Sequence, residues 1–514
     1  MPVWVVGAKE SAERDRAAIE KGTPSRVLMQ RAGNAAAAEI VRRYRERLND
    51  GAIVFTGPGN NGGDGWVVAA ALAGAEVTVK VVEALKPDPR KSPDAAAERE
   101  RALPKVTVTT DVDERSGVVV DALLGTGFEG EPRGEIGAAI SRVNALRNGG
   151  ARVAALDVPS GLNATDGKHG VCVVADLTTS FGGIKRGTLL ARDCCGEIVA
   201  IDIGLDQPAS NAGGQPRLPT LATGDWVSSR VPPIRYDAHK GSRKRLAIIG
   251  GGPGMPGAVV LGARAALRSG IGLVRTMVAP DNTGAVLTAV PSALNSHWPE
   301  TNEGIKTEIA EWADAAVIGP GLGKSSGSRE LVEKVLRSTD VPILLDADAL
   351  NDFAGDAASL GKLLLGKRAL VTPHVAEFAR LMDTNAETVL ANRFDIGTDL
   401  AQKLGAIVLL KGSPTVIFSP VGDRAVVARG TAALGTGGSG DLLAGIAGTL
   451  LAQMDDPMEA ATCAAWIHGR AAELCGYVRG TTLEDVLYAL PRAWNEPEPV
   501  LESPVMAALP AVAT

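Results

Sequence analysis

Short apolar runs, separated by helical patterns, predict a sheet in the first half of the chain. The runs lie at residues 52–56, 77–82, 118–120 and 153–156. Two amphipathic patterns occupy residues 10–47, and a third helix is expected to start at Trp66, after a glycine-rich loop at 57–65. This β-α-β order predicts a parallel sheet in an α/β domain, with its ligand at the carboxyl ends of the strands.

The second half of the chain repeats this alternation. Strand-like runs lie at residues 246–250, 315–318, 342–345 and 407–410, with helical patterns between them. Polar or glycine-rich loops follow the last three runs, at 319–323, 346–350 and 411–415. A second α/β domain is therefore expected, again with a site at the strand ends.

The boundary between these halves is set by a polar, proline-punctuated segment at residues 207–216, which is typical of a linker. A chain of 514 residues is also too long for one hydrophobic core. We expect one domain at 1–215 and a second at 216–495. Residues 496–514 are expected to form a loose C-terminal tail.

Composition narrows the class of protein. Charged residues make up 22% of the chain, and no apolar run reaches the roughly 18 residues that a membrane span needs. Residues 1–4 lack the features of a signal peptide, so a cytoplasmic protein with no membrane partner is expected. A net charge of −6 argues against nucleic acid as the main partner. The five cysteines are odd in number and lack the spacing of zinc ligands.

Glycine is unusually frequent, at 61 of 514 residues, so the four occurrences of G-x-G-x-x-G are not diagnostic. The stretch 435–441 is more specific, because it leads into a helical pattern starting at Leu442, with Ser439 placed as N-cap. Such a helix start binds anions through free backbone N–H groups and the helix dipole. Since no G-x-x-x-x-G-K-[ST] is present, this loop is expected to hold phosphates with help from Lys411 and Lys240.

Asp441 ends this glycine-rich stretch, and two interpretations fit it. A carboxylate in the first turn of a helix is stabilising by roughly 0.3–1 kcal/mol. A bound phosphate would repel it, however, so it also fits a base aimed at a hydroxyl beside a phosphoryl group. The catalytic interpretation is favoured over the structural one.

Polar side chains accompany the glycines of the loop at 57–65. They are Asn60, Asn61 and Asp64. With Glu83 as the ribose acid, the loop is consistent with an ordinary dinucleotide fingerprint. Such a loop gains nothing from these side chains, whereas beside Asp121 and Ser160 their oxygens suit a hard cation. Each aspartate taken alone is equally consistent with a strand-end turn or a helix cap.

Four segments in this order resemble the NAD(P)H-hydrate epimerase domain over about residues 10–205. They are Leu28–Gly33, Gly57–Gly65, Asp121–Gly127 and Asp157–Gly161, and Phe181–Gly187 keeps only the Phe-Gly and lysine of a fifth. The resemblance implies a Rossmann-like three-layer sandwich, with potassium (K+) at Asn61, Asp121 and Ser160. It implies Asp157 as the catalytic residue beside the hydrated nicotinamide. Substrate contacts are implied at Asn60, Asn61, Gly62, Gly63, Asp64, Gly125, Thr126, Gly127, Phe128, Glu129, Gly130, Glu131 and Asp157.

A second set of segments is similar to the ADP/ATP-dependent NAD(P)H-hydrate dehydratase, a ribokinase-like fold, over about residues 225–490. The set comprises Tyr236–Gly241, Asp346–Leu350, Thr372–His374 with Glu377, Lys411–Gly412 and Gly437–Asp441. Val375 and Ala376 replace the Pro-Gly of the family, so the position of His374 stays open. The resemblance implies Asp441 as catalytic, with Ala258, Gly321 and His374 also facing the hydrate. Nucleotide contacts are implied at Lys411, Gly412, Ser413, Pro414, Thr415 and Gly440.

The two resemblances imply a fusion of two enzymes that repair hydrated NADH and NADPH (NADHX and NADPHX). The first would interconvert the C6 epimers. In the second, Asp441 would deprotonate the C6 hydroxyl of the S form, ADP with Mg2+ would phosphorylate it and leave as AMP, and phosphate would then depart. ADP is expected over ATP because the fused form resembles the bacterial enzymes, and a homo-oligomer is expected. A vitamin-precursor kinase with a non-catalytic N-terminal binding module is the alternative.

Overall fold

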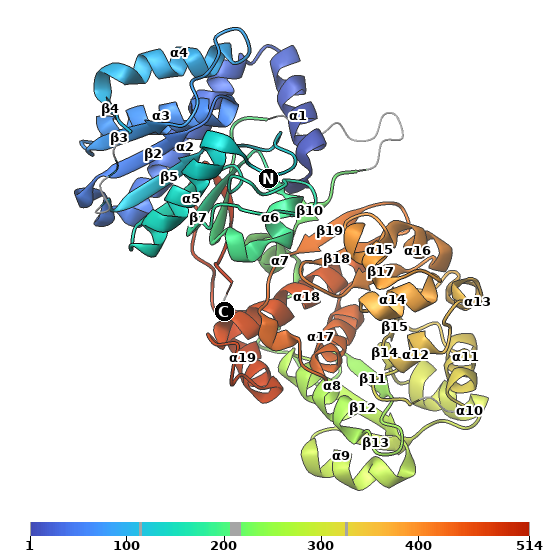
Figure 1. Cartoon of the computed structure of the whole chain (residues 1–514). Helices are drawn as coiled ribbons and strands as arrows, with labels where there is room; N and C mark the ends of the chain where they lie inside the picture. Colours follow the sequence, from blue (N-terminus) through green and yellow to red (C-terminus); the bar gives the residue numbers. More distant parts are fainter. Residues whose placement is uncertain (1, 111, 113–115, 206–216, 324–326, 513–514) are drawn as a thin grey trace. The chain divides into compact units, whose positions relative to one another are not determined.

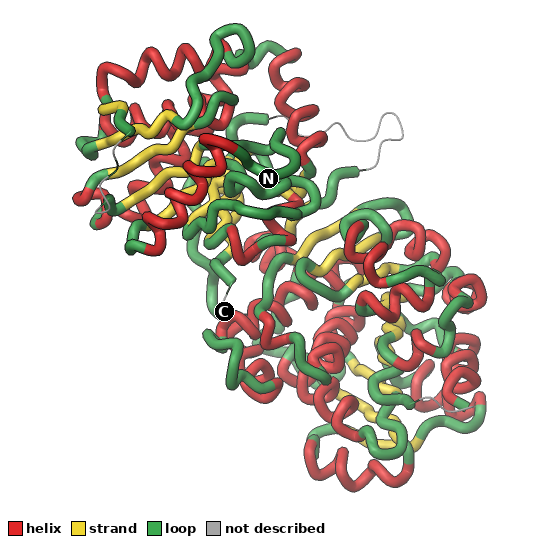
Figure 2. The backbone as a smooth tube through the Cα atoms, in the orientation of Figure 1, coloured by secondary structure: helices red, strands yellow, loops and turns green. Residues whose placement is uncertain are grey.

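The computed structural model describes residues 2–110, 112, 116–205, 217–323 and 327–512. The chain divides into two compact units: Met1–Gly214 with Pro499–Val512, and Gln215–Glu498 with Ala513–Thr514. Figure 1 labels the elements of each unit, and Figure 2 separates helices from strands. The expected linker at 207–216 lies outside the described residues.

A mostly parallel sheet forms the middle layer of the first unit. Its strands in spatial order are β20 (Val505–Leu509), β9 (Glu197–Ile201), β7 (Leu177–Phe181), β6 (Arg152–Leu156), β5 (Val118–Ala122), β2 (Ala52–Thr56), β3 (Val79–Glu83) and β4 (Thr107–Val108). Neighbours pair in parallel except β20, which is antiparallel to β9. A short parallel pair, β1 (Val3–Val6) with β8 (Ile184–Lys185), lies in the same unit. The four strands expected in this half are confirmed, β2 at the expected bounds and the other three with one or both ends shifted by one or two residues.

Helices cover both faces of this sheet (Figure 2). They are α1 (Ala8–Glu20), α2 (Ser25–Tyr44), α3 (Asn60–Gly74), α4 (Pro93–Ala102), α5 (Gly134–Asn148) and α6 (Arg186–Leu190), with 3-10 turns η1 (Arg47–Asp50), η2 (Leu103–Lys105) and η3 (Arg192–Cys194). Val54 of β2 packs in one core with α2 and α3, whereas Ile53 and Phe55 pack in another with α5. Successive strand residues point to opposite faces, so burial on both sides explains the continuous apolar runs. The expected three-layer α/β sandwich is confirmed.

The start of α3 differs from the expectation. The helix begins at Asn60, six residues before the expected start at Trp66. The glycines of this stretch allow close packing: a Cβ on Gly62 would lie 2.0 Å from the carbonyl oxygen of Gly57, and one on Gly65 would lie 2.5 Å from Cβ of Ala122. Glycine is a poor helix former, so the glycine-rich sequence at 57–65 favoured a loop. In the folded structure the close contacts of these glycines outweigh their low helix propensity.

The expectation of a loose tail at 496–514 is wrong for part of that range. Residues Pro499–Val512 belong to the first unit, and β20 pairs with β9 along its length. The side chains of Ala507 and Leu509 are each 3% exposed. Such a short alternating run is easily overlooked after a proline-rich stretch, because periodicity over five residues is a weak signal. The last strand of the chain therefore completes an edge of the first sheet.

The second unit is built on a larger sheet. Its strands in spatial order are β13 (Leu294–His297), β12 (Leu273–Val278), β11 (Arg245–Ile249), β14 (Ala315–Ile318), β15 (Ile343–Leu345), β16 (Ala369–Val371), β17 (Ile407–Leu410), β18 (Thr415–Phe418), β19 (Arg424–Val427) and β10 (Thr220–Leu221). The strands from β13 to β17 are parallel, β18 is antiparallel to both its neighbours, and β10 is parallel to β19. The strands expected in this half are confirmed.

The helices of the second unit are α7 (Gly224–Arg230), α8 (Pro256–Arg268), α9 (Thr283–Ala289), α10 (Asn302–Ile305), α11 (Ser328–Ser338), α12 (Asp348–Asn351), α13 (Ala357–Leu364), α14 (Val375–Leu381), α15 (Ala386–Ala391), α16 (Gly397–Leu404), α17 (Ser439–Gln453), α18 (Pro457–Leu474) and α19 (Leu483–Asn495). Shorter turns are η4 (Pro280–Asn282), η5 (Lys306–Ala310) and η6 (Ala432–Leu434). No described helix combines the length and the apolar character that crossing a bilayer requires.

Helix α17 is fixed in the core by its own glycines. A Cβ on Gly445 would lie 2.1 Å from the carbonyl oxygen of Gly262 on α8, and one on Gly448 would lie 2.5 Å from Val317 of β14. Both glycines therefore allow the backbone of α17 to approach α8 and the sheet. The start of α17, which carries Asp441, is consequently held at the carboxyl ends of the parallel strands.

Candidate active sites

A cavity of about 570 Å³ lies beside the carboxyl ends of β2, β5 and β6 in the first unit. The expected site residues that line it are Asn60, Asn61, Asp64, Gly125, Thr126, Gly127, Phe128 and Asp157. Gly62 and Gly63 are buried within α3, and Glu129, Gly130 and Glu131 continue the loop outside the cavity lining. Residues of α1 and α2, among them Asp15 and Met29, also line the cavity and were not expected there.

Asp157 is fixed in an unusual backbone conformation at the end of β6. Its φ of 64° lies in the left-handed region, which costs of order 1–3 kcal/mol for a residue other than glycine. The side chain accepts hydrogen bonds from the backbone N–H of Phe181, at 3.0 Å, and from Nζ of Lys185. Lys185 is 1% exposed and also donates to the carbonyl oxygen of Phe181, at 2.7 Å. The structure thus places a buried ammonium against the expected catalytic carboxylate.

Two more carboxyl groups face this lysine and aspartate pair. Burial, with the charges of Asp157 and Asp15, raises the pKa of Asp64 well above its usual range, and Lys185 opposes the rise. Burial likewise raises the pKa of Asp15 on α1. Asp15 was not expected at this site, because it lies in a charged amphipathic helix with no motif around it. The cavity therefore brings together carboxyl groups in different environments, as acid–base chemistry requires.

Hydrogen bonds connect the three expected potassium ligands, of which Asn61 lines the cavity, because Asn61 and Ser160 both donate to the carbonyl oxygen of Leu124 and Ser160 also donates to Asp121. Ser160 donates from its hydroxyl to Asp121, at 2.6 Å, and from its backbone N–H to the other carboxylate oxygen, at 2.8 Å. Asn61 donates from Nδ2 to the carbonyl oxygen of Leu124, at 2.8 Å. Its Oδ1 is buried and has no hydrogen-bond partner among the described residues. An unpaired buried oxygen beside an aspartate and a serine is the donor set that a hard cation takes.

Asp121 is completely buried, and burial raises its pKa to about 6 against the hydrogen bonds from Ser160 and Leu123. Glu83, the ribose acid of the dinucleotide alternative, is instead paired with Arg99 of α4. This pairing disfavours that alternative, because the carboxylate already has a partner within the fold.

The start of α17 forms the centre of the second site. Gly438, with φ of 95°, is the N-cap, and Ser439 is the first helical residue rather than the expected cap. The hydroxyl of Ser439 lies 3.4 Å from Nε2 of His468, whose pKa burial lowers to about 4. Burial, followed by the charge of Asp346, raises the pKa of Asp441 to about 7, while Lys411 opposes the rise. A carboxylate with a pKa near neutrality is well suited to a general base.

Lys411 follows β17 and is shared among carboxylates. Its Nζ lies 2.7 Å from Oδ1 of Asp346 and 3.9 Å from Oε2 of Glu377. Burial alone would lower the pKa of Lys411, but Asp346, Glu377 and Asp441 raise it above its ordinary value. A Cβ on Gly440 would lie 3.3 Å from this ammonium, so the glycine leaves the helix start open to Lys411. Asp346 was noted in a loop motif but was not expected as a site residue.

His374 keeps a defined position despite the loss of the Pro-Gly pair. It is the N-cap of α14, where its Nδ1 accepts from the backbone N–H groups of Ala376, at 3.0 Å, and Glu377, at 3.4 Å. Glu377 accepts in return from the backbone N–H of His374, at 2.9 Å. Burial lowers the pKa of His374. Val375 and Ala376 form the first turn of the helix, so a reciprocal cap replaces the family's turn.

A buried arginine shapes the loop that carries the expected nucleotide contacts. Arg393 is 4% exposed and donates to the carbonyl oxygens of Pro414, at 3.0 Å, and Lys411, at 3.4 Å. Gly412 has φ of 153°, and a Cβ there would lie 2.1 Å from Arg393. Thr415 donates to the carbonyl oxygen of Gly412, at 2.9 Å. The loop from Lys411 through Ser413 to Thr415 is thus fixed by a residue that no motif indicated.

The remaining residues expected to contact a ligand lie at opposite ends of the parallel strands, Ala258 and Gly321 at the carboxyl ends and Lys240 at the amino ends. Ala258 and Gly321 are neighbours, since a Cβ on Gly321 would lie 2.9 Å from Cβ of Ala258. Both lie in segments that follow carboxyl ends of parallel strands, β11 and β14. Lys240 is exposed and precedes the amino end of β11, the opposite edge from Lys411. The expectation that Lys240 helps to hold phosphates is therefore not supported within one chain.

Comparisons with known proteins match both units. A family model described as NAD(P)H-hydrate dehydratase matches residues 246–491, and one described as YjeF-related protein N-terminus matches residues 25–187. The bifunctional NAD(P)H-hydrate repair enzyme Nnr of Escherichia coli is 35% identical over 502 residues, covering 96% of this chain and 94% of that protein. The protein of the same name from Moorella thermoacetica is 33% identical over 537 residues, covering 99% of each chain.

A solved structure of the ADP/ATP-dependent NAD(P)H-hydrate dehydratase from Bacillus subtilis, co-crystallised with ATP and Mg2+, is similar to part of the chain. It is 29% identical, with a TM-score of 0.47, and covers 53% of this chain and 96% of that one. The full-length relatives, in contrast, span both units at more than 30% identity. The chain therefore belongs to the family of bifunctional NAD(P)H-hydrate repair enzymes.

Proposed function

We propose that the first unit interconverts the R and S epimers of hydrated NADH and NADPH, and that the second dehydrates the S epimer with ADP, releasing AMP and phosphate. The observation that carries this proposal is a complete carboxylate and lysine site in each unit of a chain whose relatives match it from end to end. A vitamin-precursor kinase would need only the second site. The paired sites therefore favour repair over that alternative.

In the first unit, epimerisation requires the C6 hydroxyl to leave and return on the opposite face of the ring. Asp64, whose pKa is raised by burial, is suited to donate a proton to the departing hydroxyl, while the ring nitrogen supplies electrons to C6. Asp157 faces the ring, with Lys185 as its counter-charge, and takes the proton of the returning water. No nucleotide is needed, because the hydroxyl leaves as water.

Potassium is proposed at Asn61, Asp121 and Ser160. The unpaired Oδ1 of Asn61 supports it, because an alkali cation would satisfy that oxygen. These residues are all oxygen donors, which suit an alkali cation better than zinc or copper. The cation would supply positive charge beneath the helix start where the substrate phosphates are expected.

In the second unit, Asp441 is proposed to take the proton of the C6 hydroxyl while the terminal phosphoryl group of ADP is transferred to that oxygen. Lys411, Gly412, Ser413, Pro414, Thr415 and Gly440 are proposed to hold the nucleotide. Lys411 and the free N–H groups of α17 would neutralise part of the negative charge of the nucleotide phosphates, and Mg2+ would neutralise the remainder. The phosphate then leaves C6 as the ring nitrogen supplies electrons, and loss of a C5 proton to solvent restores the C5–C6 double bond. Ala258, Gly321 and His374 are proposed to face the hydrate.

The test separates the two reactions within the full chain. Cutting after residue 215 would remove β20 from the first sheet, so single substitutions are the sharper tool. Asp441→Asn should lower dehydration by about 10²–10⁴-fold while R and S hydrates still interconvert. Asp157→Asn should leave dehydration of the S epimer intact and stall at the R epimer, except for spontaneous conversion. Epimer-resolved chromatography, regained NADH absorbance and phosphate release report the outcome.

Asp455→Asn provides the matched control, because Asp455 is an exposed aspartate outside both sites. It should change neither reaction. Accumulation of a stable phosphorylated hydrate would indicate a kinase and would overturn the dehydratase proposal. Loss of both reactions in Asp157→Asn would overturn the assignment of one reaction to each unit. We also propose that the chain acts in the cytoplasm as a homo-oligomer on small-molecule substrates, and size measurement in solution tests the assembly.

A further inference from the structure

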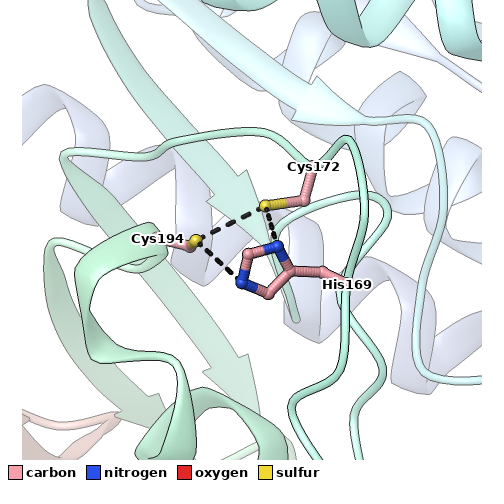
Figure 3. Close-up of side chains that lie close together, drawn as sticks. All are labelled: His169, Cys172 and Cys194. Atoms are coloured by element: carbon pink, nitrogen blue, oxygen red, sulfur yellow. Dashed lines mark hydrogen bonds between the residues drawn. The ribbon is translucent and has the colours of Figure 1, made fainter.

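Three side chains that the sequence separates come together in the first unit, away from the cavity. The sulfur of Cys172 lies 3.4 Å from the sulfur of Cys194 and 3.5 Å from Nδ1 of His169. The sulfur of Cys194 lies 3.7 Å from Nε2 of the same imidazole. Figure 3 shows the edge of the imidazole turned toward both sulfurs. All three ligand atoms lie within 4.8 Å of one another, and both cysteines are buried while His169 is exposed. Sequence spacing gave no indication of this cluster.

The backbone holds both cysteines in place without help from the cluster. The carbonyl oxygen of Cys172 accepts from Nδ2 of Asn144 on α5, at 2.8 Å, and the carbonyl oxygen of Cys194 accepts from the N–H of Ala175, at 2.9 Å. The third member, His169, lies in an exposed loop and is freer to adjust. Two fixed buried sulfurs and one exposed nitrogen make a preformed site with an entry path from solvent.

We propose that His169, Cys172 and Cys194 form a binding site for a thiophilic cation such as Zn2+, with one coordination position open to solvent. In a tetrahedral zinc site, bonds of about 2.3 Å to sulfur and 2.0–2.1 Å to nitrogen place ligand atoms about 3.5–3.8 Å apart. In the cluster the two sulfurs lie 3.4 Å apart, and each has one ring nitrogen of His169 near it, Nδ1 at 3.5 Å from Cys172 and Nε2 at 3.7 Å from Cys194. With a single nitrogen as the ligand atom, the three ligand atoms lie within 4.8 Å of one another. Two thiolates and one neutral imidazole are also the ligand types that thiophilic metals select over alkali cations.

Binding is balanced by the release of two thiol protons, one from each cysteine, while the imidazole donates a lone pair. Both cysteines are buried, so their protons leave as the cation binds and not before. The complex of a divalent cation with two thiolates is neutral, which suits a half-buried position.

The cluster joins two segments that lead away from the proposed epimerase site. Cys172 is in the loop that follows Ser160, and a Cβ on Gly161 would lie 3.0 Å from Cα of Cys172. Cys194 is in η3, which follows Lys185 and α6. A bound cation would therefore cross-link the segment after a proposed potassium ligand to the segment after the lysine that holds Asp157. The site itself does not depend on the proposed reaction.

The test uses the full-length chain, reduced and stripped with a chelator. Zn2+ is titrated against a chromophoric competitor, and Co2+ is added separately to read thiolate-to-metal charge transfer in the near ultraviolet. We expect one Zn2+ per chain and a cobalt–thiolate band. Cys172→Ser and Cys194→Ser should each weaken Zn2+ binding at least about 10-fold and reduce the band. His169→Ala, a substitution at an exposed residue, should weaken binding with the fold intact.

Cys475→Ser is the matched control, because this cysteine lies in the second unit with its sulfur bonded only to the carbonyl oxygen of Ala471 among the hydrogen bonds described. It should leave the affinity and the band unchanged. No cobalt–thiolate band, or equal affinity in the wild type and the Cys172→Ser, Cys194→Ser and His169→Ala variants, would overturn the proposal. Loss of two thiols on treatment with hydrogen peroxide, with no metal uptake by the reduced chain, would show a disulfide pair instead and would also overturn it.

Discussion

The two units both place a lysine among carboxylates at the carboxyl edge of a sheet, but the lysine has a different role in each. Lys185 is 1% exposed and is bound to one aspartate and one carbonyl oxygen. The side chain of Lys411 is 19% exposed, and it is shared by Asp346 and Glu377 while also lowering the pKa of Asp441. The first lysine is buried within the fold, whereas the second is partly exposed and is the one that we propose to contact the nucleotide.

The helix starts beside these lysines differ in the same way. Asp64 is the fifth residue of α3, beyond the free N–H groups, and burial raises its pKa well above the usual range. Asp441 is the third residue of α17, within the first turn, and its pKa is raised only to about 7. The first arrangement favours a proton donor and the second a proton acceptor. Similar glycine-rich helix starts can therefore support opposite acid–base roles, because burial and neighbouring charge set the pKa.

The largest expected difference between the units is in stability, because only the first sheet contains a strand from the C-terminal end of the chain, β20. Leu509→Ala removes a side chain that is 3% exposed on β20 and should destabilise the first unit by about 2–5 kcal/mol. Epimerisation should then be lost at a lower urea concentration than dehydration. Urea unfolding followed by the two activities measures this difference. Val500→Ala, at a side chain 93% exposed, is the control and should change stability by less than about 0.5 kcal/mol.

Parallel loss of both activities in Leu509→Ala would contradict this prediction. It would mean that β20 stabilises the whole chain and that the two units do not unfold independently. The prediction also bears on domain boundaries, because residues near the C-terminus belong to the N-terminal unit.

Much of the fold could be predicted because parallel strands buried on both faces read as unbroken apolar runs. The run at 52–56 coincides with β2, and the run at 407–410 coincides with β17. The start of α3 and strand β20 could not be predicted in this way. In the first, tertiary contacts at Gly62 and Gly65 override propensity, and in the second the run is too short for periodicity to show.

The candidate sites were predictable where a motif follows a strand directly. Asn61, Asp121 and Asp157 each follow or end a strand of one parallel sheet, so topology alone brings them to one edge. Asp15 and Arg393 had no such signal, because they reach the sites from helix α1 and from a turn before α16. Side chains that arrive from outside the sheet require the folded structure to be found.

The next effect concerns potassium, which we propose for the first unit alone. Asn61→Leu keeps the approximate size of the side chain but removes the unpaired Oδ1. In the wild type, K+ at a concentration 100 times its Kd should stabilise the first unit by about 2.7 kcal/mol, and this increment should disappear in the variant. Thermal unfolding in K+ against tetramethylammonium measures it, and dehydration by the same samples is the internal control. A wild-type first unit that unfolds identically in both salts would contradict the proposal.

The smallest expected effect is on the pH dependence of dehydration, which tests whether Lys411 differs from Lys185 in its role. Asp441 must be ionised to act as a base, so dehydration should rise with pH through its pKa of about 7. Asp346 raises that pKa and Lys411 lowers it. Asp346→Asn should therefore move the rising limb of kcat/KM to lower pH, and Lys411→Met should move it to higher pH. Both profiles are measured from regained NADH absorbance at saturating ADP.

Asp348→Asn tests whether the size of the shift follows the strength of the electrostatic interaction with Asp441. Asp348 raises the pKa of Asp441 less than Asp346 does, so its variant should move the limb in the same direction by a smaller amount. The opposite signs of the two main variants distinguish an electrostatic effect from damage to the site, since damage lowers the rate without reversing the direction of the shift. A limb that moves the same way in Asp346→Asn and Lys411→Met would show that a group other than Asp441 controls the profile. In that case Lys411 would resemble Lys185, a structural counter-charge, and the contrast between the two units would fail at its centre.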